Sequence, residues 1–186
     1  MNATIDPRRC AVVLVDYQQR LLPAIHRGAE VVAEAVRLAD CARALGIRVV
    51  GTEQNPDGLG PNAAEIRSRC ETTVAKMHFD GCVDGLVTAL RAPDQPPPVD
   101  VVIAGCETHV CLMQTAHGLL RAGFGVRVAA NACGTRFPAD HDLALQRLSQ
   151  AGAVLASVEM IAFEWLGTCE HGRFRAVLEI LKAPRS

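Results

Sequence analysis

The sequence predicts an α/β fold in which a parallel β-sheet is covered by helices on both faces. Residues 10–16 and 99–105 are continuous apolar runs. Continuous rather than alternating apolar character is typical of a parallel strand that is buried on both faces. Segments with helical periodicity alternate with such runs along the chain. This alternation predicts parallel strands that are joined by right-handed helical crossovers.

Six strands and the helices between them follow from this pattern. The strands are expected at residues 10–16, 47–52, 72–76, 99–105, 125–130 and 153–158. The helices are expected at 29–45, 63–69, 83–91, 109–122 and 139–151, and over 159–182 with a break near 167–172. Gly46 and Gly123 stand where helix ends are expected. Segments 53–61 and 91–100 are rich in turn-forming residues and are predicted as loops.

Length and composition predict a single domain over residues 1–186. Of the 186 residues, 49% are hydrophobic, which is enough to bury a core. The formal net charge is -1, without a run of like charges, so no nucleic-acid partner is expected. The N-terminal segment has no signal-peptide core, and no apolar stretch is long enough to span a bilayer. We therefore expect a cytoplasmic protein without a membrane partner.

The chain contains eight cysteines, namely Cys10, Cys41, Cys70, Cys82, Cys106, Cys111, Cys133 and Cys169. An even number can indicate disulfides in small secreted proteins, but this chain has neither their size nor a signal peptide. Most of the eight lie among Ala, Val and Leu, where a thiol behaves as a small hydrophobic group. Most are therefore expected to be packing residues.

Polar side chains stand where three of the predicted strands end. Asp16 ends the first strand and Lys76 ends the strand at 72–76. The strand at 99–105 is followed by GCETHVC, which leads into a helix at Cys111. Taken singly, these residues could be a turn cap, a solvated cation and a core thiol. Because ligands bind beyond the carboxyl ends of parallel strands, the three together predict a reactive site.

These three residue types suit nucleophilic catalysis. A thiol attacks as its thiolate, and both a helix start and the Lys76 cation are expected to lower the pKa of Cys111. A carboxylate within hydrogen-bond reach, such as Asp16, can accept the proton. The same helix start offers free backbone N–H groups to an oxyanion.

Three segments resemble the isochorismatase-like cysteine hydrolases in order, spacing and residue type. They are VVLVDYQQRLLPAI, VAKMHFDGC and VVIAGCETHVCLMQTAHGLLRAGFGVRVAANACGTR, and the resemblance covers about residues 10–160. The segment EQNPDGLG is similar to the isochorismatase domain-containing subgroup. The resemblance implies a three-layer α/β/α fold of flavodoxin/Rossmann-like type with a six-stranded parallel sheet. It also implies a homo-oligomer, either a dimer or a tetramer.

By resemblance, residues at the matching positions take the family roles. Cys111 is then the nucleophile, Asp16 the general base and acid, and Lys76 the group that holds the thiolate and the carboxylate in place. The peptide bond between Cys106 and Glu107 is expected to be cis. It is expected to direct the N–H of Glu107, together with that of Cys111, at the oxyanion.

Departures from the family pattern limit what the resemblance implies. The nicotinamidase branch carries a zinc site of Asp-x-His…His type after the second strand, whereas TEQNPDGLG has no His. In the stretch that resembles DAxxSR, Asn131 and Thr135 replace the usual acidic residue and Ser, while Arg136 is kept. We expect the first departure to disfavour both a metal site by that route and nicotinamidase activity, and the second to alter packing or substrate fit.

No cofactor or metal ion is expected from the remaining residues. Cys106, His109 and Cys111 lie close in sequence, but zinc requires three or four ligands, and no second cluster supplies the rest. Neighbouring strand ends make several residues candidates for lining a substrate pocket. These are Gln18, Glu53, Gln54, His78, Phe79 and His109.

Three hypotheses for function follow. The first is hydrolysis of a small amide or related acyl compound, at a C–N bond outside peptides, through a thioacyl-enzyme at Cys111. The second is isochorismate-type hydrolysis of a vinyl ether with Asp16 as the acid, which needs no Cys nucleophile. The third is a binding or scaffold protein that keeps the fold without turnover. The intact set of Asp16, Lys76 and Cys111 favours a small-molecule enzyme over a scaffold.

Overall fold

The computed structural model describes residues 5–91 and 96–183, and a six-stranded parallel sheet forms its centre. Its strands are β1 (Cys10–Val15), β2 (Arg48–Gln54), β3 (Thr72–Lys76), β4 (Asp100–Gly105), β5 (Gly125–Ala129) and β6 (Val154–Ala156). Their order across the sheet is β3-β2-β1-β4-β5-β6, which is the Rossmann-type order. The predicted six-stranded parallel α/β fold is therefore confirmed.

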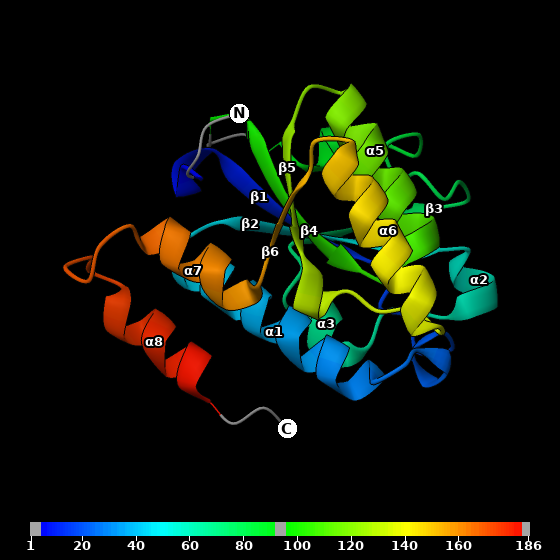
Figure 1. The fold of residues 1–186 in the computed structure, drawn as a ribbon, viewed down its shortest axis with the longest axis horizontal. Coiled ribbons are helices and arrows are strands. Elements are labelled where there is room, and N and C mark those ends of the chain that lie inside the picture. The colour runs from blue at the N-terminus through cyan, green and yellow to red at the C-terminus, as the bar shows by residue number, and fades with distance from the viewer. Residues whose placement is uncertain (1–4, 92–95, 184–186) are drawn as a thin grey trace.

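Helices cover both faces of the sheet. The α-helices are α1 (Gly28–Ala44), α2 (Pro56–Leu59), α3 (Ala64–Arg67), α4 (Leu86–Ala89), α5 (Met113–Arg121), α6 (Pro138–Gln150), α7 (Val158–Leu166) and α8 (Phe174–Lys182). Shorter turns are the 3-10 segments η1 (Pro7–Arg9), η2 (Leu22–Ala24) and η4 (Ala130–Ala132) and the π-helical η3 (Thr108–Leu112). Figure 1 shows α1, α7 and α8 on one face and α5 and α6 on the other. Within the described ranges, no helix is long and apolar enough to cross a membrane.

The strands β1 and β4 form the most deeply buried part of the sheet. Every residue of both strands is buried, which explains their continuous apolar sequences. Their register pairs Val15 with Gly105 at the carboxyl end. A Cβ atom at Gly105 would lie 2.5 Å from the Cβ of Val15, so glycine allows the two strand ends to approach. The chain switches direction across the sheet between β1 and β4, which is where such folds bind ligands.

Several element boundaries differ from the sequence-based expectation. The strand β2 continues to Gln54, and the segment predicted as a loop at 53–61 also contains α2. The helix expected at 83–91 is only the single turn α4, because Gly85 has a φ of 97° and the chain becomes helical only after it. The helix expected at 109–122 begins instead with η3. Residues 92–95 of the proline-rich loop lie outside the described residues.

Candidate active site

Strand ends and one helical turn bring Asp16, Lys76 and Cys111 together. Asp16 follows β1 directly, in the left-handed conformation with a φ of 55°. Lys76 is the last residue of β3, and Cys111 lies in η3, which follows β4. The exposed fractions are 0% for Asp16, 1% for Lys76 and 8% for Cys111. A carboxylate, an ammonium and a thiol are thus enclosed at the carboxyl edge of the sheet.

Asp16 and Lys76 form a fully buried ion pair. Oδ2 of Asp16 lies 2.7 Å from Nζ of Lys76, and Oδ1 of Asp16 accepts a hydrogen bond from the Thr52 hydroxyl at 2.6 Å. The contact at Oδ2 is a charge contact, because no described group makes a hydrogen bond of good geometry to that atom. Removing two charges from water costs several kcal/mol per ion, so such a pair is weak evidence for stability. It leaves a carboxylate oxygen able to accept a proton.

Burial dominates the electrostatics of the Cys111 thiol. Burial and, next, the charge of Asp16 raise the pKa of Cys111, Lys76 lowers it, and together these effects raise the pKa to about 12. Lys76 acts in the predicted direction, but the net pKa of Cys111 is raised, so the prediction that this thiol has a lowered pKa is wrong. Cys111 is the fourth residue of η3 rather than the first, and desolvation outweighs the nearby cation. The thiol is protonated at neutral pH and needs an adjacent base.

The peptide bond between Cys106 and Glu107 is cis, as the resemblance implies. Cys106 is completely buried, and its N–H donates to the carbonyl of Val15 at 2.9 Å. The Glu107 carboxylate turns towards Arg136, which donates to it at 2.7 and 3.2 Å. Within the described part of the chain, the backbone N–H of Glu107 has no hydrogen-bond acceptor. It is therefore free to bind an oxyanion.

Gln54 is a candidate pocket residue that does reach this group. Its Oε1 accepts a hydrogen bond from Nζ of Lys76 at 2.7 Å and lies 3.9 Å from Sγ of Cys111. Its Nε2 donates to the carbonyl of Met77 at 2.8 Å. The Gln54 amide therefore bridges the ammonium, the thiol and the loop that follows β3.

Gln18 and Glu53 are not brought to the thiol. The Gln18 side chain is fully buried, where it donates to the carbonyls of Gln54 and Gly60 and accepts from the N–H of Gln54. Glu53 accepts a hydrogen bond from the N–H of Asn62 at 2.8 Å. Both side chains hold the segment that follows β2 rather than lining a pocket.

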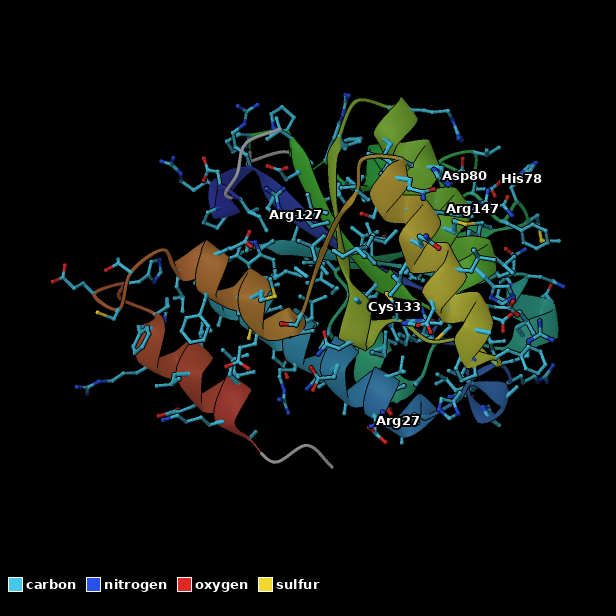
Figure 2. The ribbon with its side chains drawn as sticks, in the orientation of Figure 1. Arg27, His78, Asp80, Arg127, Cys133 and Arg147 are labelled. Carbon is cyan, nitrogen blue, oxygen red and sulfur yellow. The ribbon has the colours of Figure 1, made fainter. Side chains whose placement is uncertain are left out.

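His78 and Phe79 lie on the loop that follows Lys76. The side chain of His78 is 62% exposed, and its Nδ1 lies 3.1 Å from Asp84. Figure 2 shows His78 and Asp80 on the outer side of the molecule near α5. Phe79 is 50% exposed, and its carbonyl accepts a hydrogen bond from Thr115. Both residues therefore lie on the loop at residues 77–84, which we call the rim, and not beside the Cys111 thiol.

The His109 side chain also points away from Asp16, Lys76 and Cys111. Its Nδ1 lies 2.8 Å from Oγ1 of Thr135, and its Nε2 lies 3.9 Å from Oδ2 of Asp140. Thr52, which donates a hydrogen bond to Asp16, was not predicted as a site residue. The strand pattern could have indicated it. Alternate residues of a strand point to the same face, so Thr52 lies on the same face as Gln54, and Glu53 lies on the opposite face.

Two cavities of the described structure lie away from Cys111. The first, about 480 Å³, lies between the first turns of α1 and α6 and is lined by polar residues that include Glu34 and His141. Cys133, between α1 and α6 in Figure 2, lies in its wall. The second, about 1020 Å³, lies between α1 and α8. All eight cysteines are free thiols, and the described residues include no group of three His, Cys, Asp or Glu that could hold a metal ion.

Solved structures with the same fold include the following three proteins. The MAR1 ribonuclease from Caenorhabditis elegans is 30% identical with a TM-score of 0.90, covering 98% of this chain and 95% of that one. The YcaC gene product of Escherichia coli, described as an octameric hydrolase of unknown specificity, is 26% identical with a TM-score of 0.87, covering 97% and 90%. YcaC from Pseudomonas aeruginosa, with hexane-2,5-diol and covalent acrylamide, is 27% identical with a TM-score of 0.84, covering 97% and 92%.

Sequence comparison identifies the family. The isochorismatase domain model matches residues 10–160. Isochorismatase domain-containing protein 2 of Xenopus laevis is 33% identical over 97% of this chain and 87% of its own length. The matched range begins at β1 and includes Asp16, Lys76 and Cys111. This chain therefore belongs to the isochorismatase family.

Proposed function

We propose that this protein is a cysteine hydrolase that cleaves a small amide or related acyl compound at a C–N bond outside peptides. In this proposal Cys111 is the nucleophile, Asp16 is the general base and acid, and Lys76 stabilises the charged forms of both. The observation that carries the proposal is the buried Asp16–Lys76 pair at 2.7 Å beside a thiol with a pKa of about 12. A protonated nucleophile next to an enclosed carboxylate is the arrangement that general-base catalysis requires.

Acylation begins with proton transfer from Cys111 to Asp16 while Sγ attacks the carbonyl carbon and forms a C–S bond. Lys76 stabilises the thiolate character that develops on sulfur, since it already lowers the pKa of Cys111. The N–H groups of Glu107 and Cys111 stabilise the oxyanion of the tetrahedral intermediate. Asp16 then returns the proton to the leaving amine as the C–N bond breaks.

Deacylation uses the same groups in reverse roles. Asp16 removes a proton from water, and the resulting hydroxide attacks the thioester carbon. The C–S bond breaks, the carboxylic acid product leaves, and the sulfur recovers the proton that Asp16 holds. One carboxylate serves both half-reactions because each begins and ends with Asp16 ionised.

Two relatives support a hydrolase with a reactive nucleophile. The Escherichia coli relative is described as a hydrolase. The Pseudomonas aeruginosa relative carries covalent acrylamide, which is an electrophilic amide of the kind that thiolates attack. The octameric state of the Escherichia coli protein supports a homo-oligomer here as well. Met77 and Phe79, which are 67% and 50% exposed on the rim, are suitable contacts for a second copy.

The proposal is tested by a screen of small amides and carbamoyl compounds, with the Cys111→Ala variant as the blank. We expect one or more compounds to release amine or ammonia only with the wild-type protein. The panel also includes a vinyl ether, and turnover of this compound that survives in Cys111→Ala but is lost in Asp16→Asn would favour vinyl-ether hydrolysis instead. A labelled RNA belongs in the panel because one relative is named as a ribonuclease. Absence of turnover with any compound would favour the scaffold hypothesis.

A further inference from the structure

The turn that carries Cys111 is joined to residues 134–141 by two crossed Thr–His pairs. Oγ1 of Thr108 lies 3.0 Å from Nδ1 of His141. Oγ1 of Thr135 lies 2.8 Å from Nδ1 of His109. Neighbouring residues of η3 thus supply one Thr and one His, and residues 134–141 supply the opposite member of each pair.

The atom that carries the proton decides which group is the donor in each pair. Thr108 has one hydroxyl proton and donates it to the carbonyl of Gly134 at 3.0 Å. Nδ1 of His141 therefore carries a proton and donates to Thr108. Nε2 of His109 faces the Asp140 carboxylate at 3.9 Å, which favours a proton on Nε2. With the ring proton on Nε2, Nδ1 of His109 accepts from the Thr135 hydroxyl.

An ion pair extends this connection to a third consecutive residue. Arg136 donates through Nε and Nη2 to the two carboxylate oxygens of Glu107, at 2.7 and 3.2 Å. Glu107, Thr108 and His109 are therefore each held by a side chain from residues 134–141. These three residues lie between the N–H of Glu107 and the thiol of Cys111, which are the groups that must face one reacting carbonyl.

Apolar packing alone would bury this turn without fixing its orientation. Thr108 is 0% exposed and Thr135 is 2% exposed, so both hydroxyls are held away from water. Directional hydrogen bonds between buried groups specify one arrangement of a turn, because a displaced turn leaves those groups unpaired. Two such contacts, on Thr108 and His109, restrict both the position and the rotation of the turn, and the ion pair of Glu107 with the half-exposed Arg136 adds a third contact on the adjacent residue.

We propose that Thr135 and His141 are positioning residues, which orient the turn from Glu107 to Cys111 so that its N–H groups face the oxyanion of the acylation step. This inference rests on the proposed function. Neither residue touches the reacting atoms, since Thr135 acts through His109 and His141 acts through Thr108.

Two reagents for the same thiol separate this role from general support of the fold. With p-nitrophenyl acetate, Sγ of Cys111 attacks the ester carbonyl through an oxyanion while Asp16 takes the thiol proton, a C–S bond forms, and the bond between the carbonyl carbon and the aryloxy oxygen breaks to release p-nitrophenolate. With iodoacetamide, Sγ displaces iodide at a saturated carbon, and no oxyanion forms. Acylation therefore depends on the orientation of the N–H groups, whereas alkylation does not.

The first comparison uses variants of Thr135. Thr135→Val keeps the shape and removes the hydroxyl, and we expect acylation to slow by at least about tenfold while alkylation of Cys111 stays within about threefold. Thr135→Ser restores the hydroxyl and should return acylation to within about threefold of wild type. Thr88→Val, at an exposed position in α4, is the matched control and should leave both rates unchanged.

A second pair of variants covers the case in which Thr135→Val does not fold, as judged by circular dichroism. His141→Leu should slow acylation selectively, and His141→Asn, whose amide can replace the Nδ1–H donor, should restore most of it. Equal acylation in the wild type and the variants that lack the hydrogen bond would overturn this inference alone. Equal losses of acylation and alkylation would also overturn it. A wild-type protein whose acylation matches the Cys111→Ala blank would overturn the proposed function as well.

Discussion

The two sides of the candidate site are built from different interactions. On the side of β2 and β3, strands carry Thr52, Gln54 and Lys76, and an ion pair with a 2.7 Å separation holds Asp16. On the side of β4 and β5, the turn η3 is held by neutral hydrogen bonds and by the Glu107–Arg136 pair. The register of the sheet sets the positions of the Asp16 and Lys76 charges, whereas contacts between loops set the directions of the backbone N–H groups. In the proposed mechanism, the first side supplies proton transfer and the second orients the N–H groups.

The largest effect expected on the strand side is the loss of the base. Asp16→Asn keeps the shape of the side chain but removes the proton acceptor, so turnover should fall by about a hundredfold or more. The rate of amine release measures this effect. Asp84→Asn, a change on the rim beside His78, is the control and should stay near the wild-type rate. A folded Asp16→Asn variant with a wild-type rate would remove Asp16 from the mechanism.

Unfolding measurements separate the catalytic role of the buried Asp16–Lys76 pair from its effect on the free energy of unfolding. Lys76→Met leaves the Asp16 charge buried without its partner, and this should lower the free energy of unfolding by about 3–5 kcal/mol. The double variant that adds Asp16→Asn removes both charges and should recover most of that loss while staying inactive. Urea unfolding of the single and double variants measures the difference. A double variant that is less stable than Lys76→Met would show that the pair itself stabilises the fold.

A smaller effect is expected on the titration of the thiol. Lys76 lowers the pKa of Cys111 against the larger effects of burial and Asp16, so Lys76→Ala should shift the alkylation profile of Cys111 to higher pH. Iodoacetamide labelling across a pH series, measured by peptide mass spectrometry, gives the profile. Exposed Cys169 in the same sample provides the internal reference and should not shift. An unchanged profile for Cys111 would indicate that Lys76 does not act on the sulfur.

No effect is expected from metal removal. The proposed proton transfers run between Cys111, Asp16, the leaving amine and water, with Lys76 stabilising the charges, so chelation should leave turnover unchanged. Elemental analysis of the purified protein, with activity measured before and after chelation, provides the check. Stoichiometric zinc whose removal abolishes turnover would mean that neither side of the site is complete without a metal ion.

The strands and the positions of Asp16, Lys76 and Cys111 were accessible from sequence for one physical reason. Buried parallel strands have continuous apolar sequences, and their carboxyl ends meet at one edge of the sheet. The end of β2, and with it the directions of the Glu53 and Gln54 side chains, was not accessible. The strand β2 extends two residues beyond the predicted position 52, and this extension places Gln54 at the thiol while Glu53 reaches Asn62.

The protonation state of Cys111 could not be predicted from the sequence either. A helix start and a cation both favour the thiolate, and these are visible as sequence features. The opposing effect is desolvation, which depends on how tightly the finished fold encloses the sulfur. At 8% exposure this effect prevails and raises the pKa of Cys111 to about 12.

The backbone at position 16 restricts which amino acid can serve there. A φ of 55° is readily adopted by Gly, Asn and Asp, but rarely by other residues. Of these three, only Asp carries a carboxylate. Glutamate, the usual conservative exchange, has the right charge but an unsuitable backbone preference. Transplanting this site into another scaffold would therefore require copying the left-handed turn after the first strand before copying any side chain.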